Sequence, residues 1–390
     1  MIFSEAGIST TPPVLGPAEA ALCGDTGGVG VLWCGRGATA LYWAFRAAVA
    51  WHRTEPAPAV ILPAVTCESV AQAALAAGLA LHFADADPAT GMPGRAEIER
   101  AYTPGVVAVV VAHLYGQTTS LTDLAGWCCA RDVILIEDAA HALGGYLPDG
   151  SPVGSVGGMT IYSFNRTKII EPGGGALLVR DAALWDLVRD DVTIHEPTGA
   201  RDPRRTELLG RSANQIEHGL GALFRLGLGS GASEFVRRIA PAYRSLYLQP
   251  IRDPAVLASV WPSIPGVARR RADKAAIYAD TLAEGPWRLT TAWAHSRTCW
   301  RFSLVAERSA YVPAFVDAIR ARGALVSTLY WTLTDYFGPE GTCPAAREFG
   351  AGVINLCVDD TVSEGWVRDR AADVLQCGRE LFAAPEPAEH

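Results

Sequence analysis

The first half of the chain alternates short apolar runs with helical stretches, and this alternation limits the possible folds more than any other feature. Six runs have the length and composition of strands: Val60–Leu62, Leu79–Ala84, Val106–Ala112, Val133–Glu137, Met159–Phe164 and Ala176–Val179. Helices are expected between some of them, at Thr39–Ala50, Ser69–Ala77 and Leu121–Ala130. Strands that alternate with helices indicate a mainly parallel sheet covered by helices. The sequence therefore predicts a doubly wound α/β domain over residues 1–215.

The pattern changes in the second half. Residues 216–285 are rich in arginine and glycine between apolar segments, and we expect a helical connector there. Residues 286–390 predict a smaller α+β domain, with strands at Cys299–Val305 and Val353–Leu356 and helices at Val312–Arg322 and Glu364–Phe382. A chain of 390 residues is long enough for a large domain and a smaller one.

Composition excludes several classes of protein. The chain is 49% hydrophobic and 19% charged, as in globular proteins, and its net charge of −8 argues against nucleic acid as a partner. The apolar runs are too short to cross a membrane, and the first residues do not resemble a signal peptide, so we expect a cytoplasmic protein without a membrane partner. The nine cysteines lack paired spacing and should be reduced thiols. The eight histidines show no metal-ligand spacing, so no metal is expected.

Lysine is nearly absent. Among 33 basic residues only Lys168 and Lys274 are lysines. Arginine can replace the charge of a surface lysine but cannot form a Schiff base, because its guanidinium stays protonated. Lys168 is therefore a candidate nucleophile, and the alternative is an ordinary surface lysine.

The segments around Lys168 favour the first interpretation. Asp138 ends an apolar strand, where ligands bind in parallel α/β sheets, although it could also cap the next helix. The turn Gly35–Thr39 leads into a helix whose N-terminus can hold a phosphate. Ser163 offers a hydroxyl, and Gly173–Gly175 lets the backbone pass close to a bound group. A phosphate cradle, a carboxylate and a lysine together match the needs of pyridoxal 5′-phosphate (PLP).

Three consecutive motifs carry a resemblance to a known family. Glu137–Gly144, Val153–Gly157 and Ser163–Lys168, followed by Gly174-Gly-Ala-Leu-Leu, resemble the DegT/StrS-type sugar aminotransferases, which are PLP enzymes of fold type I. The resemblance implies a large domain with a seven-stranded, mainly parallel sheet and a small C-terminal α+β domain. It is dense between residues 35 and 180 and thin between 200 and 290.

The resemblance also implies roles for individual residues. Lys168 would bind the cofactor covalently and move a proton between substrate and cofactor, and Asp138 would pair with the pyridine nitrogen. His141 stands where the family usually has glutamine, beside the phenolic oxygen of the ring. Cys67 replaces the aromatic residue that commonly stacks on the ring. The phosphate would be held by Gly37, Ala38, Thr39 and Ser163.

The predicted activity is transfer of an amino group from glutamate or glutamine to a keto sugar, most simply a nucleotide-linked one, by a homodimer with shared active sites. One alternative is a PLP-dependent deoxysugar dehydratase, but such enzymes carry histidine in place of the lysine. The other is a PLP-binding regulator without turnover, which the intact set of Lys168, Asp138 and Ser163 disfavours.

Other clusters have plainer interpretations. Arg204, Arg205, Arg211 and the run Arg269–Arg271 could hold a diphosphate, although a solvated helix face is favoured for the run. His113–Gly116 is expected to shape the floor of the site. Five tryptophans are expected to pack in the core or between domains: Trp43, Trp51, Trp287, Trp293 and Trp300.

Overall fold

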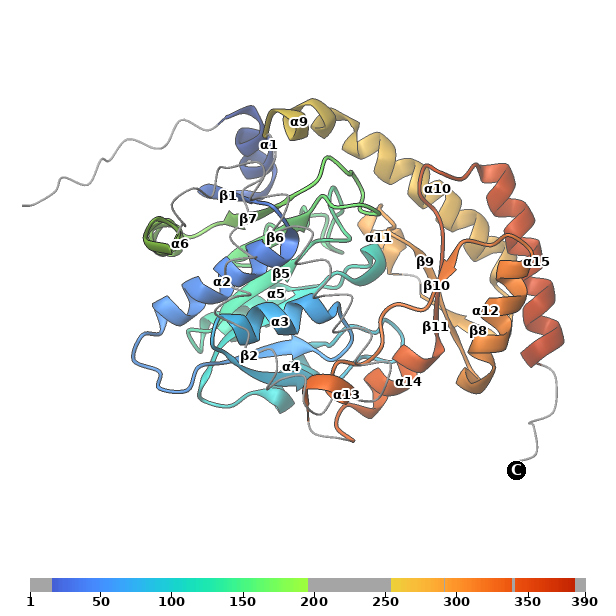
Figure 1. The fold of residues 1–390 in the computed structure, drawn as a ribbon, viewed down its shortest axis with the longest axis horizontal. Coiled ribbons are helices and arrows are strands. Elements are labelled where there is room, and N and C mark those ends of the chain that lie inside the picture. Colours follow the sequence, from blue (N-terminus) through green and yellow to red (C-terminus); the bar gives the residue numbers. More distant parts are fainter. Residues whose placement is uncertain (1–15, 196–253, 291, 339–340, 383–390) are drawn as a thin grey trace, which may run out of the picture.

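The computed structural model describes residues 16–195, 254–290, 292–338 and 341–382. Figure 1 shows a large domain around a twisted sheet and a smaller domain around a second sheet, joined along one side by the long helix α10 (Ile264–Leu282). The predicted connector at 216–285 and the arginines Arg204, Arg205 and Arg211 fall wholly or partly outside the described residues. The predicted division at residues 215 and 285 therefore stays a prediction.

The large sheet has seven strands in the order β1-β7-β6-β5-β4-β2-β3. Its strands are β1 (Gly30–Cys34), β2 (Ala59–Pro63), β3 (Ala80–Ala84), β4 (Val106–Ala112), β5 (Ile134–Asp138), β6 (Met159–Ser163) and β7 (Gly175–Val179). Neighbours from β3 to β6 run parallel, whereas β7 is antiparallel to both β6 and β1. The six predicted strands are confirmed within one or two residues. Strand β1, an edge strand that pairs only with β7, was not predicted.

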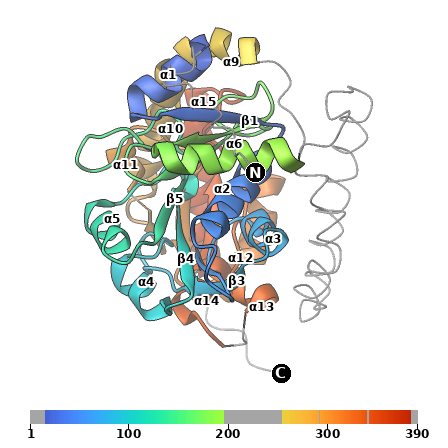
Figure 2. The ribbon, with the colours of Figure 1, turned by 90° about the vertical axis from the view of Figure 1, so that its left-hand side faces the viewer.

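Helices cover both faces of this sheet. The first face carries α2 (Gly37–Trp51), α3 (Glu68–Ala76) and α6 (Ala182–His195), and the second carries α1 (Pro17–Thr26), α4 (Arg95–Ala101) and α5 (Thr122–Cys129), as Figure 2 shows. A sheet covered on both faces requires strands without polar alternation. Strand β4 accordingly reads Val-Val-Ala-Val-Val-Val-Ala, and all its residues are buried.

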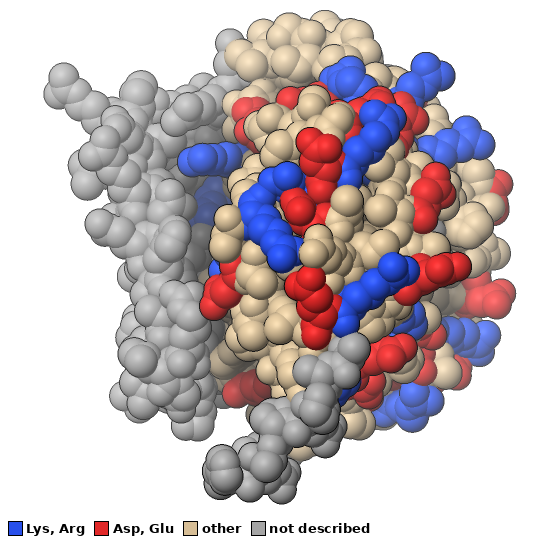
Figure 3. All heavy atoms as spheres, turned by 90° about the vertical axis from the view of Figure 1, so that its right-hand side faces the viewer, with Lys and Arg blue, Asp and Glu red and all other residues tan. Residues whose placement is uncertain are grey.

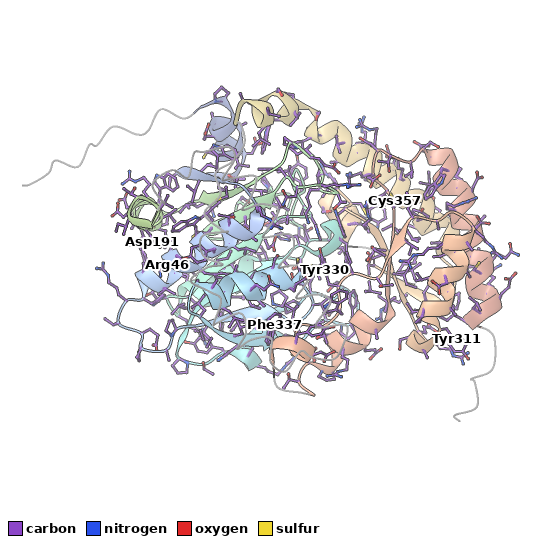
Figure 4. All side chains as sticks on the ribbon, viewed as in Figure 1. Arg46, Asp191, Tyr311, Tyr330, Phe337 and Cys357 are labelled. Atoms are coloured by element: carbon purple, nitrogen blue, oxygen red, sulfur yellow. The ribbon has the colours of Figure 1, made fainter. Side chains whose placement is uncertain are left out.

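Helices α2 and α6 are also joined by a paired ion contact. Arg46 Nε and Nη2 lie 2.8 and 2.9 Å from the two carboxylate oxygens of Asp191, and Figure 4 labels both residues at this edge of the large domain. Trp51, at the end of α2, is 37% exposed, so its predicted burial was wrong. The reason is that its Nε1 donates to Asp132 at the surface, whereas the other four tryptophans are buried.

The smaller domain has an antiparallel sheet in the order β10-β11-β9-β8. Its strands are β8 (Trp287–Leu289), β9 (Phe302–Ala306), β10 (Val326–Ser327) and β11 (Val353–Leu356). Helices α10, α12 (Val312–Ala321) and α15 (Glu364–Phe382) pack on this sheet around a separate core. The shorter helices are α9 (Pro254–Val260), α11 (Trp293–Ser296), α13 (Thr334–Phe337) and α14 (Pro344–Gly352).

Strand β9 begins three residues later than predicted, at Phe302 instead of Cys299. The backbone N–H groups of Trp300 and Arg301 donate to the carbonyl of Tyr115 in the large domain instead of pairing with the small sheet. These residues therefore join the two domains, which matters for the site described below.

The outer face of the small domain mixes both signs of charge. Figure 3 shows arginines and acidic residues interspersed there, and α15 carries the pairs Arg368–Glu364 and Arg370–Asp373. The described part of this face therefore shows no continuous basic patch of the kind that binds nucleic acid. None of the described helices has the length and hydropathy needed to span a membrane.

Candidate active site

A cavity of about 160 Å³ lies at the carboxyl ends of the large-sheet strands, beside the first turn of α2. Tyr330, which Figure 4 labels between the two domains, also lines it. Seven residues predicted for the site line this cavity: Gly37, Ala38, Cys67, Asp138, His141, Ser163 and Lys168. Thr39 does not line it. Its hydroxyl is buried in α2, where it has no hydrogen-bond partner among the described residues.

One end of the cavity is built from a close approach of backbones. A Cβ on Gly175 would come within 2.5 Å of the Gly37 nitrogen, and a Cβ on Gly37 would come within 2.9 Å of Cβ of Ser163. These glycines let the start of α2 lie directly against the ends of β6 and β7. The N-cap residue of α2 is Arg36, and its side chain does not form a capping hydrogen bond with the first turn. Its N–H groups and the positive end of the helix dipole therefore make this end suited to an anion.

Asp138 lies at the end of β5 and is 8% exposed. Its Oδ1 accepts a hydrogen bond from the backbone N–H of Ala140 at 3.0 Å, but residues 140–144 form a turn and not a helix, so the alternative role as a helix cap is wrong. Burial raises the pKa of the Asp138 carboxyl above its usual range, although the Ala140 hydrogen bond and the positive charge of Lys168 oppose this shift. A cationic group placed beside Asp138 would stabilise its ionised form.

Lys168 reaches the cavity from the loop between β6 and β7. Desolvation lowers the pKa of the Lys168 ammonium, with a smaller contribution in the same direction from the charge of Arg301, while Cys67 and Asp138 oppose the shift. A lowered pKa increases the fraction of neutral amine near pH 7, which is the nucleophilic form. The other lysine, Lys274, lies in α10, where its Nζ donates to the Asp359 carbonyl at 2.7 Å.

His141 is enclosed by aromatic rings and polar groups. Its ring stacks on Trp300, with centroids 3.9 Å apart and an interplanar angle of 2°. Its Nδ1 accepts the backbone N–H of Tyr115 at 3.4 Å, which assigns the proton of the neutral ring to Nε2, 3.4 Å from the Tyr330 hydroxyl. Burial, followed by the charges of Lys168, Arg301 and Arg271, lowers the pKa of His141 well below its usual value. The ring is therefore a neutral hydrogen-bond donor at physiological pH.

Cys67 stands at the N-cap of α3, on the cavity wall. Its Sγ accepts a hydrogen bond from the Ser69 hydroxyl at 3.2 Å, and burial raises the pKa of the thiol to about 12. Cys67 is therefore a neutral, small wall residue at neutral pH.

Several residues of the site were missed by sequence reasoning. Glu137, next to Asp138, is fully buried and lies 3.1 Å from Nε2 of His113, and it accepts hydrogen bonds from three backbone N–H groups at residues 154–157. The sequence feature that could have indicated this role is the pair of adjacent acidic residues at the end of β5. Arg271 is 3% exposed, so the predicted solvated face is wrong for this residue. It points to the Lys168 loop, whereas the exposed Arg270 pairs with Asp360.

The segment His113–Gly116 supports the site as predicted. His113 and Leu114 line the cavity, and the carbonyl of Tyr115 accepts N–H groups from the small domain. The Tyr115 hydroxyl accepts the backbone N–H of Tyr330 at 3.0 Å. This segment thus fixes the position of both domains around the cavity.

Comparison with solved structures shows that other proteins share this fold. DesI, solved in the presence of its TDP-sugar product, superposes with a TM-score of 0.70 at 22% identity, over 94% of this chain and 86% of DesI. Helicobacter pylori PseC, an aminotransferase involved in the biosynthesis of pseudoaminic acid, gives a TM-score of 0.72 at 15% identity, over 93% of this chain and 90% of PseC. At these identities the likeness establishes the fold.

The sequence assigns the chain to a family. The model of the DegT/DnrJ/EryC1/StrS aminotransferase family matches residues 14–214, just over half of the chain, and the protein belongs to this family.

Curated relatives match over shorter stretches. The dTDP-4-dehydro-2,3,6-trideoxy-D-glucose 4-aminotransferase of Saccharopolyspora spinosa is 32% identical over 31% of each chain. The L-glutamine:2-deoxy-scyllo-inosose aminotransferase of Streptomyces kanamyceticus is 36% identical over 32% of this chain and 29% of the relative. The chain spans less than half the length of the curated relatives that it matches.

Proposed function

We propose that the cavity binds PLP and that the protein transfers an amino group from glutamate or glutamine to the ketone of a sugar, with a nucleotide-linked sugar as acceptor. One observation carries the proposal. Lys168, Asp138 and the uncapped first turn of α2, which are distant in the sequence, line one cavity. The observation supports a cofactor with a carbonyl, a basic ring nitrogen and a phosphate.

The described residues fit each part of this cofactor. The N–H groups at the start of α2 and the hydroxyl of Ser163 would hold the phosphate. The buried carboxylate of Asp138 would hold the protonated pyridine nitrogen, and Nε2 of His141 would donate to the phenolic oxygen. When bound, PLP supplies an electron sink for negative charge at the substrate carbon.

Each of the chain's own groups at the site has a separate role in the proposed reaction. The neutral amine of Lys168 would hold the cofactor, and its Nζ would also accept and donate the proton that moves during amino transfer. The ionised carboxylate of Asp138 keeps the ring nitrogen protonated. Tyr330 and Cys67 keep their protons because burial raises the pKa of each group, so neither competes with Lys168 as a base.

The printed activities of two relatives support the substrate classes. The Saccharopolyspora spinosa protein is named for a dTDP-linked dehydro sugar, and the Streptomyces kanamyceticus protein is named for glutamine as donor. We extend both to this chain as part of the proposal. A homodimer with shared active sites and a cytoplasmic location stay predictions from the family resemblance.

The two lysines give a direct test. Wild-type protein, Lys168→Arg and Lys274→Arg are incubated with PLP and reduced with borohydride, and the labelled peptide is identified by mass spectrometry. The label is expected on Lys168 in wild type and in Lys274→Arg, and it should be absent from Lys168→Arg. A label on Lys274 alone, or no label in wild type, would contradict the cofactor assignment.

Substrates are then added to the PLP-loaded protein. Glutamate or glutamine should bleach the visible band and release one equivalent of the matching keto acid, and a nucleotide-linked keto sugar should restore the band and yield the amino sugar. Loss of water from a deoxysugar nucleotide without bleaching by any amino acid would instead establish the dehydratase. Binding of PLP without turnover of either kind would favour the regulator.

A further inference from the structure

Two buried side chains from the second half of the chain bind the loop that carries Lys168. Nε1 of Trp300 donates to the carbonyl of Thr167 at 2.6 Å, and Nη2 of Arg271 donates to the carbonyl of Lys168 at 2.9 Å. Trp300 is 4% exposed and Arg271 is 3% exposed. Two consecutive carbonyls are therefore fixed by residues that lie 133 and 103 positions further along the chain.

The loop needs support from outside at this point. Thr167 has a φ of 74°, in the left-handed region that residues other than glycine rarely adopt. Its own N–H donates to the Glu171 carboxylate, and the N–H of Lys168 donates to the Asn165 carbonyl. A conformation of this kind persists where surrounding contacts hold it. The bonds from Trp300 and Arg271 tie this part of the loop to the second half of the chain.

The same tryptophan also contacts His141. Its ring is parallel to the His141 ring at 3.9 Å, and Nζ of Lys168 lies 5.5 Å from its centroid. Nη1 of Arg271 donates to the Trp300 carbonyl at 3.3 Å, so the arginine and the tryptophan hold each other. One bonded pair therefore orients both the lysine and the histidine of the cavity.

The burial of Arg271 is not explained by packing alone. Desolvation lowers the pKa of its guanidinium, and in the described part of the chain no carboxylate lies within ion-pair distance of it. A buried arginine without an ion pair is unfavourable compared with an apolar side chain of similar size. Its two hydrogen bonds to backbone carbonyls offset part of the free-energy cost of burying the charge.

We propose that Trp300 and Arg271 form a clamp that positions Lys168 and His141 from the small-domain side. Both are positioning residues, and the proposal rests on the proposed function of Lys168 as the lysine that binds the cofactor. The clamp makes the reactivity of Lys168 depend on contacts with α10 and with the segment before β9.

The test distinguishes the effect of losing the two hydrogen-bond donors from the effect of altered side-chain packing. Trp300→Phe keeps an aromatic ring against His141 but removes the N–H donor, and Arg271→Met keeps the length of the side chain but removes both hydrogen bonds. Trp293→Phe is a matched control because Trp293 is buried and its Nε1 has no hydrogen-bond partner among the described residues. Arg270→Met is the second control, since Arg270 is exposed and pairs with Asp360.

For each protein, the apo form is mixed with PLP, the rate of covalent attachment is measured by borohydride trapping, and the thermal unfolding midpoint is recorded. We expect attachment to slow about tenfold in each clamp variant, in line with a lost hydrogen bond to a buried carbonyl, and to stay within about twofold in the controls. With glutamate as donor, kcat should fall while KM changes little. Arg271→Lys, which retains one donor, should recover part of the rate and serves as the readout if Arg271→Met does not fold.

The outcomes are distinguishable. If wild type does not attach PLP at Lys168, the proposed function itself fails. If wild type attaches PLP and the clamp variants do so at the wild-type rate, or if the controls slow as much as the clamp variants, the clamp is overturned and the function stands.

Discussion

Glu137 is expected to be a major determinant of stability near the site, although it does not line the cavity. Its Oε1 accepts the N–H groups of Val156 and Gly157 at 2.9 and 2.6 Å. Its Oε2 accepts the N–H of Gly154 at 2.9 Å and lies 3.1 Å from Nε2 of His113. The carboxylate therefore organises the whole turn before β6. Glu137→Gln replaces one acceptor oxygen with a donor and tests this role.

The size of the effect follows from the geometry. If the new amide nitrogen faces Val156 and Gly157, two backbone donors lose their partner. If it faces Gly154 and His113, Nε2 of His113 can accept from it in the tautomer that carries its proton on Nδ1, so only the Gly154 N–H is left unpaired. The second orientation costs less free energy, so we expect the variant to adopt it. It loses one charge-assisted bond of roughly 1.5–3 kcal/mol and weakens two others, so we expect a loss of about 2–4 kcal/mol in the free energy of unfolding.

Urea denaturation followed by tryptophan fluorescence measures the change, with Glu97→Gln as control. Glu97 also accepts a backbone N–H, from Gly94 at 2.9 Å, but at the surface, so its variant should lose less than about 1 kcal/mol. Burial raises the pKa of Glu137, but the hydrogen bonds from His113, Gly157 and Gly154 outweigh it and hold the pKa below its usual value. Its stabilisation is therefore present above the unfolded pKa of about 4.3 and is lost as the pH falls further, so the difference between wild type and variant should shrink in acid. Equal losses in the two variants would refute the reasoning.

Four further outcomes concern the cavity. Asp138→Asn should keep bound PLP but lower the rate of amino transfer at least about a hundredfold, because an amide cannot keep the ring nitrogen protonated; near-native turnover would leave Asp138 with only a structural role. Ser163→Ala should weaken PLP binding by roughly 1.5–3 kcal/mol in equilibrium titrations, and an unchanged dissociation constant would remove Ser163 from the phosphate site. Cys67→Tyr should slow PLP release severalfold, since aromatic contact adds about 0.5–1.5 kcal/mol; faster release would show that the space is already filled. The rate of PLP attachment should level off at a lower pH than for an ordinary lysine, because desolvation lowers the pKa of Lys168, and a profile centred near pH 10.4 would contradict that shift.

The central strands of the large domain could be predicted because burial on both faces leaves a continuous apolar run, as in Val106–Ala112. Strand β1 also contains an apolar run, Val31–Cys34, but it was not predicted. Strand β9 starts late because the N–H groups of Trp300 and Arg301 donate to the carbonyl of Tyr115. Tyr115 is far away in the sequence, so no local sequence pattern indicates this contact.

The same distinction holds for the site. Asp138 ends β5, and Lys168 follows the end of β6 by five residues, so local reasoning places both near the same edge of the sheet. Tyr330 and Trp300 reach the cavity region from the small domain, and their roles depend on how the domains pack. Arg271 lies in a run of three arginines, and only the orientation of α10 decides which of them is buried.

The placement of the two lysines has a chemical consequence for a protein proposed to act on keto sugars. Reducing and keto sugars condense slowly with exposed amines, and lysine side chains are the usual targets of this glycation. Lys274 is 5% exposed and bonded to a backbone carbonyl, and Lys168 lines the cavity. Every other basic side chain of the Lys and Arg set is a guanidinium, which stays protonated and does not form such adducts with simple ketones. Condensation of side-chain amines with dissolved carbonyl compounds is thereby confined to the one position where the cavity can turn it into catalysis.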